Sequence, residues 1–184
     1  NTGPANVGFN EFAPLMERNR PQLVASGIAG SNNTFGNEVV ASALYDRASI
    51  SVGQYHIQTD GFRKNNGQNH DIYNAFMQYA LTPKLNVQTE FRRRETEHGD
   101  LLLDFDKRRF DPSLRRKLKE NTARIGARYE LSSDQDLIVS GKYIDRIENN
   151  RTKLIESENL KISGFQIEAQ HLLRHEYFNT VLGG

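Results

Sequence analysis

The sequence predicts an all-β protein built as an antiparallel up-and-down meander of about eight strands. Three observations lead to this fold class. A two-residue hydrophobic period recurs along the chain, no apolar run approaches the roughly 20 residues of a membrane helix, and long and short connections alternate between the expected strands. Such a meander forms a transmembrane-type β-barrel or a section of a larger one.

The two-residue period is clearest between Asp71 and Glu97. Thr82-Pro83 interrupts it, which predicts a hairpin. One face of this hairpin carries Tyr73, Ala75, Met77, Tyr79, Leu81, Leu85, Val87, Thr89 and Phe91, and the other carries Asn74, Gln78, Asn86, Gln88, Glu90, Arg92 and Arg94. The polar face must meet water, so the hairpin belongs either to a sheet exposed on one side or to the wall of a water-filled barrel.

The other elements follow in order along the chain. Residues 1–20 mix Gly, Pro and Asn without a sustained period, so we expect an irregular lead-in before a β-barrel domain over 21–184. Besides the hairpin, strands are predicted at 22–30, 38–45, 48–59, 121–131, 136–147 and 160–173. Residues 176–184 begin a ninth strand, and because a barrel must pair its last strand with its first, we expect the domain to be truncated at its C-terminus.

The predicted connections differ in length in a regular way. Those at 31–37, 60–70, 98–120 and 148–159 are long and polar, whereas those at 46–47, 82–83 and 132–135 are short. Outer-membrane barrels show this asymmetry, with tight periplasmic turns and longer external loops. The absence of Trp argues against a membrane barrel, because only Phe and Tyr remain to form aromatic girdles.

Composition excludes several classes of protein. The chain carries 24 basic and 23 acidic residues, for a formal net charge of +1, so no overall field favours nucleic acid. There is no cysteine, which excludes disulfide scaffolds, thiolate zinc sites and cysteine nucleophiles.

Several segments also resemble a known family. They are NVGFNEFAPLMERNR (6–20), ASGIAGSNNTFGNEVVASALYDR (25–47), the stretch 49–92, GDLLLDFD (99–106) and SDQDLIVS (133–140). They resemble the C-terminal β-barrel region of large bacterial envelope tetratricopeptide-repeat proteins, in which helical repeats precede a porin-like or TonB-dependent-receptor-like barrel. The resemblance implies a bacterial outer-membrane location, contact with outer-membrane lipid and an upstream repeat region in the same chain. It brings no catalytic residue and no cofactor.

Chemical motifs are weak. The loop carboxylates Asp100, Asp104, Asp106 and Asp111 lack a calcium-loop pattern, and His171 and His175 lack a third ligand, so no metal site is predicted. No hydrolase elbow or phosphate loop occurs, and we expect no enzyme. The basic runs 92–94 and 115–119 are interpreted as solvated charge rather than as a nucleic-acid or lipopolysaccharide site.

The strand parity does predict one constellation of polar residues. On the barrel hypothesis these residues face the interior and line a polar lumen: Gln88, Glu90, Arg92, Arg94, Arg124, Arg128, Glu130, Lys142, Arg146, Gln166 and Glu168. Their cationic excess favours anionic solutes; the alternative is that the charges pair off and plug a small barrel. We therefore expect a porin-like channel, export or anchoring role with an unidentified solute. The alternative is a soluble β-barrel or β-sheet binding module whose apolar faces form a core and whose long loops form a ligand mouth.

Overall fold

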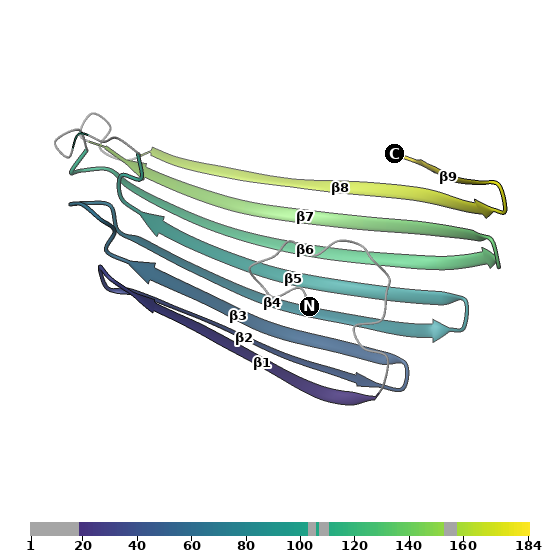
Figure 1. Ribbon diagram of the computed structural model, residues 1–184. Coiled ribbons are helices and arrows are strands. Elements are labelled where there is room, and N and C mark those ends of the chain that lie inside the picture. Colours follow the sequence, from purple (N-terminus) through teal and green to yellow (C-terminus); the bar gives the residue numbers. More distant parts are fainter. Residues whose placement is uncertain (1–18, 103–105, 107–110, 153–157) are drawn as a thin grey trace.

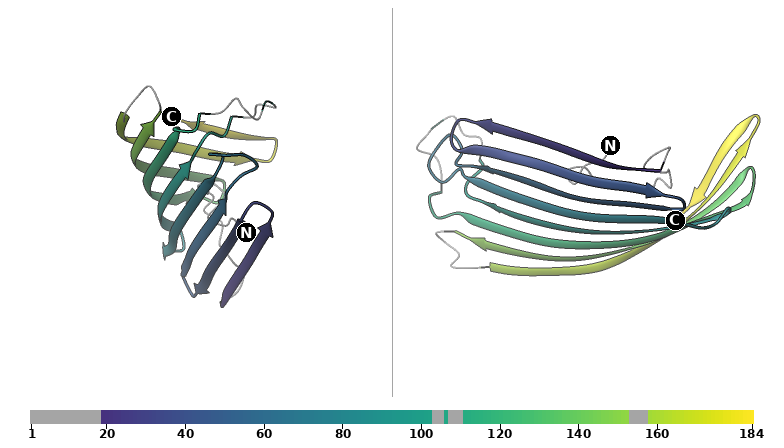
Figure 2. Two further views of the ribbon diagram at one scale, coloured as in Figure 1. Left: turned by 90° about the vertical axis from the view of Figure 1, so that its left-hand side faces the viewer. Right: turned by 90° about the horizontal axis from the view of Figure 1, so that it is seen from below.

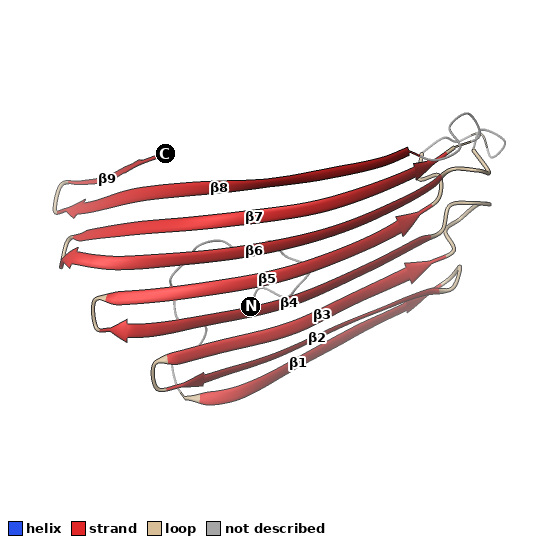
Figure 3. Ribbon diagram, turned by 180° about the vertical axis from the view of Figure 1, so that it is seen from behind, coloured by secondary structure: helices blue, strands red, loops and turns tan. Residues whose placement is uncertain are grey.

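The computed structural model describes residues 19–102, 106, 111–152 and 158–184, and it shows one antiparallel sheet (Figures 1 and 3). The order of the strands in the sheet follows the sequence. The strands are β1 (Arg20–Gly30), β2 (Thr34–Tyr45), β3 (Ala48–Thr59), β4 (Gln68–Thr82), β5 (Leu85–His98), β6 (Arg115–Ser132), β7 (Gln135–Arg151), β8 (Glu158–His175) and β9 (Phe178–Gly183). The predicted all-β up-and-down meander is confirmed, and the segment expected to begin a ninth strand forms β9. The lead-in predicted for 1–20 lies outside the described residues up to residue 18.

The connections at the two ends of the sheet differ in length. At one end the turns are 46–47, 83–84, 133–134 and 176–177, each of two residues. At the other end the connections are 31–33, 60–67, 99–114 and 152–157. We call these the turn end and the loop end. They lie on opposite sides of Figure 1, with the turn end on the right.

The connection predicted at 31–37 is wrong, because the chain turns within 31–33. Asn32 and Asn33 have φ of 57° and 53°, in the left-handed region that Asn enters more readily than most residues. The amide of Thr34 donates to the carbonyl of Ser31 at 3.2 Å. The two asparagines therefore close the turn early, and β2 begins at Thr34.

The predicted loop 98–120 is also too long, since its basic cluster forms the start of β6. Lys117 Nζ lies 3.0 Å from Glu97 Oε2, and Lys119 Nζ lies 3.8 Å from Glu95 Oε2. These opposite charges sit directly across the β5–β6 ladder. Cross-strand pairs of this kind stabilise a sheet without any apolar residue, so a charged segment extends both strands. The predicted loop 148–159 is also too long, because β7 continues to Arg151 and β8 begins at Glu158.

The sheet is twisted and curved, and its two edges do not meet (Figure 2). β1 forms one edge, and β8 with β9 forms the other. β9 pairs only with Gln170–His175, at the turn end of β8. Within the described residues the sheet is therefore an open wall rather than a closed barrel.

In the part of the chain that the structure describes, apolar side chains form no core. Among the described residues, Ile72 is the only hydrophobic residue that is buried. Phe165 is 80% exposed, Ile167 67% and Ile125 66%. The described residues contain no helix long and apolar enough to cross a membrane. The strand register puts Ile125, Ile167 and Phe165 on the same side of the sheet, so the sheet has a polar face and an exposed apolar face.

Candidate functional site

The strand register places all eleven of the predicted lumen-lining residues on one face, here called the polar face. Glu90 lies opposite Arg124, Arg124 opposite Lys142, and Lys142 opposite Gln166, which carries one row across β5–β8. The remaining members share its parity: Gln88, Arg92, Arg94, Arg128, Glu130, Arg146 and Glu168. Strand pairing therefore gathers residues that are far apart in the sequence into one polar surface.

Charges on this face contact one another across strands. Arg124 Nη1 lies 3.4 Å from Glu90 Oε2, and Asn74 Nδ2 donates to Glu90 Oε1 at 2.7 Å. Two rows further toward the loop end on the same face, Arg94 Nη2 donates to Glu120 Oε2 at 3.1 Å. Glu90 and Glu120 thus connect β4, β5 and β6. The predicted lumen-lining set included Glu90 but not Asn74 or Glu120. The sequence pattern had placed Asn74 on the polar face of the hairpin, whereas Glu120 was assigned to the loop 98–120.

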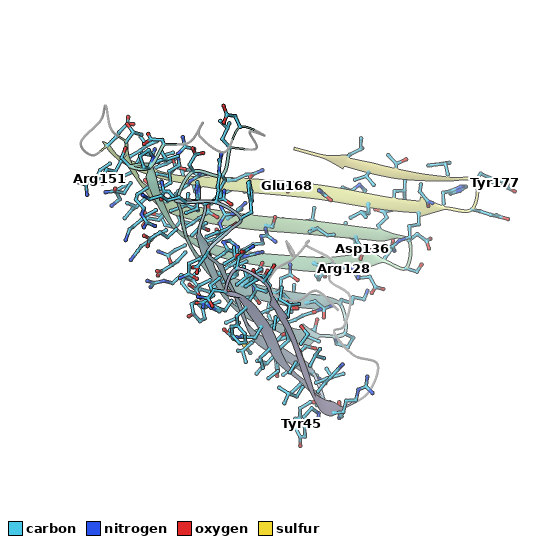
Figure 4. The ribbon with its side chains drawn as sticks, turned by 60° about the vertical axis from the view of Figure 1, so that its left-hand side comes forward. Tyr45, Arg128, Asp136, Arg151, Glu168 and Tyr177 are labelled. Carbon is cyan, nitrogen blue, oxygen red and sulfur yellow. The ribbon has the colours of Figure 1, made fainter. Side chains whose placement is uncertain are left out.

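A second cluster lies on the polar face near the turn end. Asp136 is 1% exposed and accepts two hydrogen bonds from Arg128, from Nε at 3.0 Å and from Nη2 at 2.9 Å. Arg174 of β8 also donates to Asp136 Oδ2. Figure 4 shows Arg128 and Asp136 in neighbouring strands, away from Arg151 at the loop end. The sequence pattern put Arg128 on this face. It did not put Asp136 there, because Asp136 was predicted only as the first residue of a strand.

The polar face is hollowed near the loop end. A cavity of about 370 Å³ spans β5, β6 and β7, and its lining includes Arg94, His98, Arg116, Arg146, Glu148 and Asn150. The strand pairs Arg94–Glu120–Arg146 and His98–Arg116–Asn150 form two of its rows. Sequence reasoning assigned Arg116 to a loop. Its place in β6 brings it onto the same face as Arg94 and Arg146.

The opposite face, here called the apolar face, carries a continuous hydrophobic band. Its central row runs across six strands through Ile50, Met77, Thr89, Ile125, Gly141 and Ile167. On β4 the band extends from Tyr73 to Leu81, about 27 Å at roughly 3.4 Å per residue. With a strand tilt of about 40° this becomes roughly 21 Å along a barrel axis, close to the ~25 Å apolar band of membrane barrels.

The two ends of the band differ in chemistry. Tyr45, Tyr79 and Tyr129 share the apolar face at the turn end, where they are 79%, 37% and 44% exposed. Tyr177 lies in the turn between β8 and β9 and is 83% exposed; Figure 4 labels Tyr45 and Tyr177. Toward the loop end the same face becomes charged, beginning at Arg93. The band is thus bounded by tyrosines on one side and by ion pairs on the other.

At the loop end, the β3–β4 and β5–β6 connections interlock around Asp100. Asp100 Oδ1 and Oδ2 accept the amides of Leu102 at 2.9 Å and Asp111 at 2.8 Å, and Arg63 Nη2 lies 3.5 Å from Oδ1. Asn66 Nδ2 donates to the carbonyl of Asp100 at 2.7 Å. The two amides, helped by Arg63, lower the pKa of Asp100 below its usual value despite its burial. The Asp100 carboxylate therefore organises the β5–β6 connection, and Arg63 and Asn66 join the β3–β4 connection to this residue.

The residues weighed as metal ligands have other surroundings. Both oxygens of Asp100 accept backbone amides, Asp111 Oδ1 accepts from Ser113, and Asp104 lies outside the described residues. His171 contacts Gln135 at 3.2 Å, while the ring of His175 stacks on Phe178 with centroids 4.8 Å apart. Within the described part of the chain, no three His, Asp or Glu side chains gather as a metal-binding group.

No family model matches the chain, and the search of curated proteins gave no significant match. A functional interpretation therefore depends on the chemistry of the two faces.

Proposed function

We propose that this chain forms part of the wall of a bacterial outer-membrane β-barrel. Its apolar face contacts lipid, and its polar face borders an aqueous interior with a porin-like channel, export or anchoring role. One observation carries the proposal: the hydrophobic side chains form an exposed band on one face, and a single hydrophobic residue is buried among the described residues.

The size of this band favours lipid over water. The central row crosses five spacings of about 4.8 Å from β3 to β8, so a band of roughly 24 Å by 27 Å covers on the order of 650 Å². Soluble monomers rarely expose contiguous apolar patches above a few hundred Å². In lipid the same surface needs no further cover, and the tyrosines at its turn-end margin suit the membrane interface.

The asymmetry of the connections supports an orientation. Four two-residue turns at one end and the longer connections at the other match periplasmic turns and external loops. The turn end is accordingly assigned to the periplasm and the loop end to the outside. The resemblance described above supports the same location, with an upstream tetratricopeptide-repeat region as a partner in the same chain.

The soluble alternative requires the apolar faces to pack together as a core. In the sheet these faces are exposed, and the described strands supply no second layer over them. This observation favours the membrane wall over a soluble binding module.

The membrane proposal is tested by folding residues 1–184 with and without detergent. A β-type circular dichroism spectrum and a heat-modifiable shift in gel mobility that appear only in detergent or lipid are the expected result. A cooperatively folded, monomeric β-protein in plain buffer would contradict it.

A further inference from the structure

The cavity at the loop end of the polar face has the chemistry of an anion site. Arg94, Arg116 and Arg146 come from three adjacent strands and border it together with His98. Lys117 also borders the cavity, but it has the parity of the opposite face, where its ammonium pairs with Glu97. The cationic groups that belong to the cavity are therefore guanidinium groups, which bind phosphate-type oxyanions through paired N–H donors.

The ion pairs on these arginines leave some of their N–H donors unused. Arg94 gives one Nη2 hydrogen bond to Glu120, and Arg146 gives one to Glu148. The Nε atoms of Arg94 and Arg146 are buried and have no hydrogen-bond partner among the described residues. Arg116 has no ion-pair partner within the same part of the chain. A buried N–H without an acceptor is costly, and an oxyanion in the cavity would supply acceptors.

The position of the cavity determines which molecules reach it. Its rows lie level with Glu95, Glu97 and Lys119 of the other face, beyond the loop-end margin of the apolar band. It therefore opens at the mouth of the polar interior rather than toward lipid. A volume of about 370 Å³ lies within the range of small-molecule sites and exceeds a single phosphate.

We propose that Arg94, Arg116 and Arg146 form a binding site for soluble phosphate-bearing anions at the outer mouth of the polar face. The inference rests on the proposed function for the side from which the solute arrives, whereas the arginine geometry is independent of the membrane. The shared chemistry is the phosphate oxyanion, which also occurs on lipid headgroups, so the test must separate the two sources.

The experiment measures binding of inorganic pyrophosphate by calorimetry to the full 184-residue chain folded in a neutral detergent, or in buffer if it folds there. R116Q and R146Q should each weaken binding by about tenfold or more, because each removes a charge-assisted contact. R93Q is the matched control: Arg93 lies beside Arg94 on the opposite face and pairs with Glu95, so its affinity should change less than about twofold. Circular dichroism and heat-modifiable mobility verify that each variant folds.

Two outcomes would overturn the inference. If both R116Q and R146Q bound pyrophosphate as tightly as the wild type, the cavity would not be the binding site. If R93Q lost as much affinity as they do, the effect would be one of overall charge. If either variant fails to fold, R116K provides the test, since it keeps the charge and loses the paired donors; an undiminished affinity then contradicts the inference.

A second arm separates the sources of phosphate. The chain is placed in phosphatidylcholine vesicles with or without phosphatidylglycerol, and pyrophosphate binding is compared. Equal binding supports a site for soluble anions, while competition by phosphatidylglycerol assigns the arginines to lipid and overturns the inference. Pyrophosphate binding by a chain folded in plain buffer would leave the anion site intact and refute only the membrane proposal.

Discussion

A charge placed in the centre of the apolar band gives the sharpest test of which face meets lipid. Ile125 lies in the central row of the band and is 66% exposed. In a soluble protein, Ile125→Arg at such an exposed position should change the free energy of unfolding by no more than about 0.5 kcal/mol. In a bilayer, an arginine on the lipid face near the midplane costs about 2–4 kcal/mol. The soluble and membrane interpretations therefore predict changes in the free energy of unfolding that differ several-fold.

Ser140→Arg is the matched control. Ser140 lies directly across from Gly126, the neighbour of Ile125 in β6, and has the parity of the polar face. Its other cross-strand partner is Glu168, so an arginine there gains an opposite charge. We expect its free energy of unfolding to stay within about 0.5 kcal/mol of the original chain.

The assay is urea unfolding of the chain in phosphatidylcholine vesicles. Because the sequence contains no tryptophan, the transition is followed by far-ultraviolet circular dichroism and by gel mobility. A loss of about 2–4 kcal/mol in I125R, with S140R unchanged, is expected. Equal stabilities of the two variants would refute the assignment of the apolar face to lipid.

Three further predictions concern single residues at the ends of the sheet. Asp100→Asn leaves one buried amide without an acceptor and should destabilise the interlocked loops by about 1–3 kcal/mol, measured as faster proteolysis of the loop end. The lowered pKa of Asp100 makes this stabilisation present at pH above about 3.9 and lost as pH falls through the lower folded pKa; a D100N chain with an unchanged acid limb of proteolysis would contradict this. Gly99→Ala would place a Cβ 2.1 Å from the carbonyl oxygen of Asn65, so we expect a cost of about 1–3 kcal/mol in urea unfolding, and an unperturbed transition would disprove the close approach. Asp136→Asn should cost about 1–2 kcal/mol, because Arg128 loses its charged partner yet remains partly exposed; no loss of stability would show that the pair is dispensable.

Much of the fold follows from the sequence because a strand has a period of two. Once Tyr73 and Met77 are assigned to one face, the parity of every intervening residue is fixed. Each of the later strands shows its own alternation of apolar and polar residues, so the eleven polar-face residues could be named without coordinates. The bounds of β3 were predicted in full for the same reason.

The sequence prediction was wrong where the two-residue period does not determine the local structure. Asn32 and Asn33 close a turn through positive φ, a property of single residues rather than of a pattern. Lys117 and Lys119 extend β6 through ion pairs with β5, which no local pattern in β6 can show. The Asp100 network joins two loops separated by some thirty-five residues of sequence, so its partners become visible only once the strands between them are paired.

The charged ends of β5–β7 on the two faces of the sheet have one cause, the extension of these strands beyond the apolar band. On the parity of the apolar face, Glu95 and Glu97 pair with lysines of β6 beyond the apolar band, and these pairs hold β5 and β6 together where the band has ended. The same extension carries the opposite parity beyond the band as well, and so brings Arg94 and Arg116 into one cavity. A chain that ended its strands at the edge of the band would have neither feature. The length of these strands is therefore the physical link between the stability of the loop end and the arginine cavity that it presents.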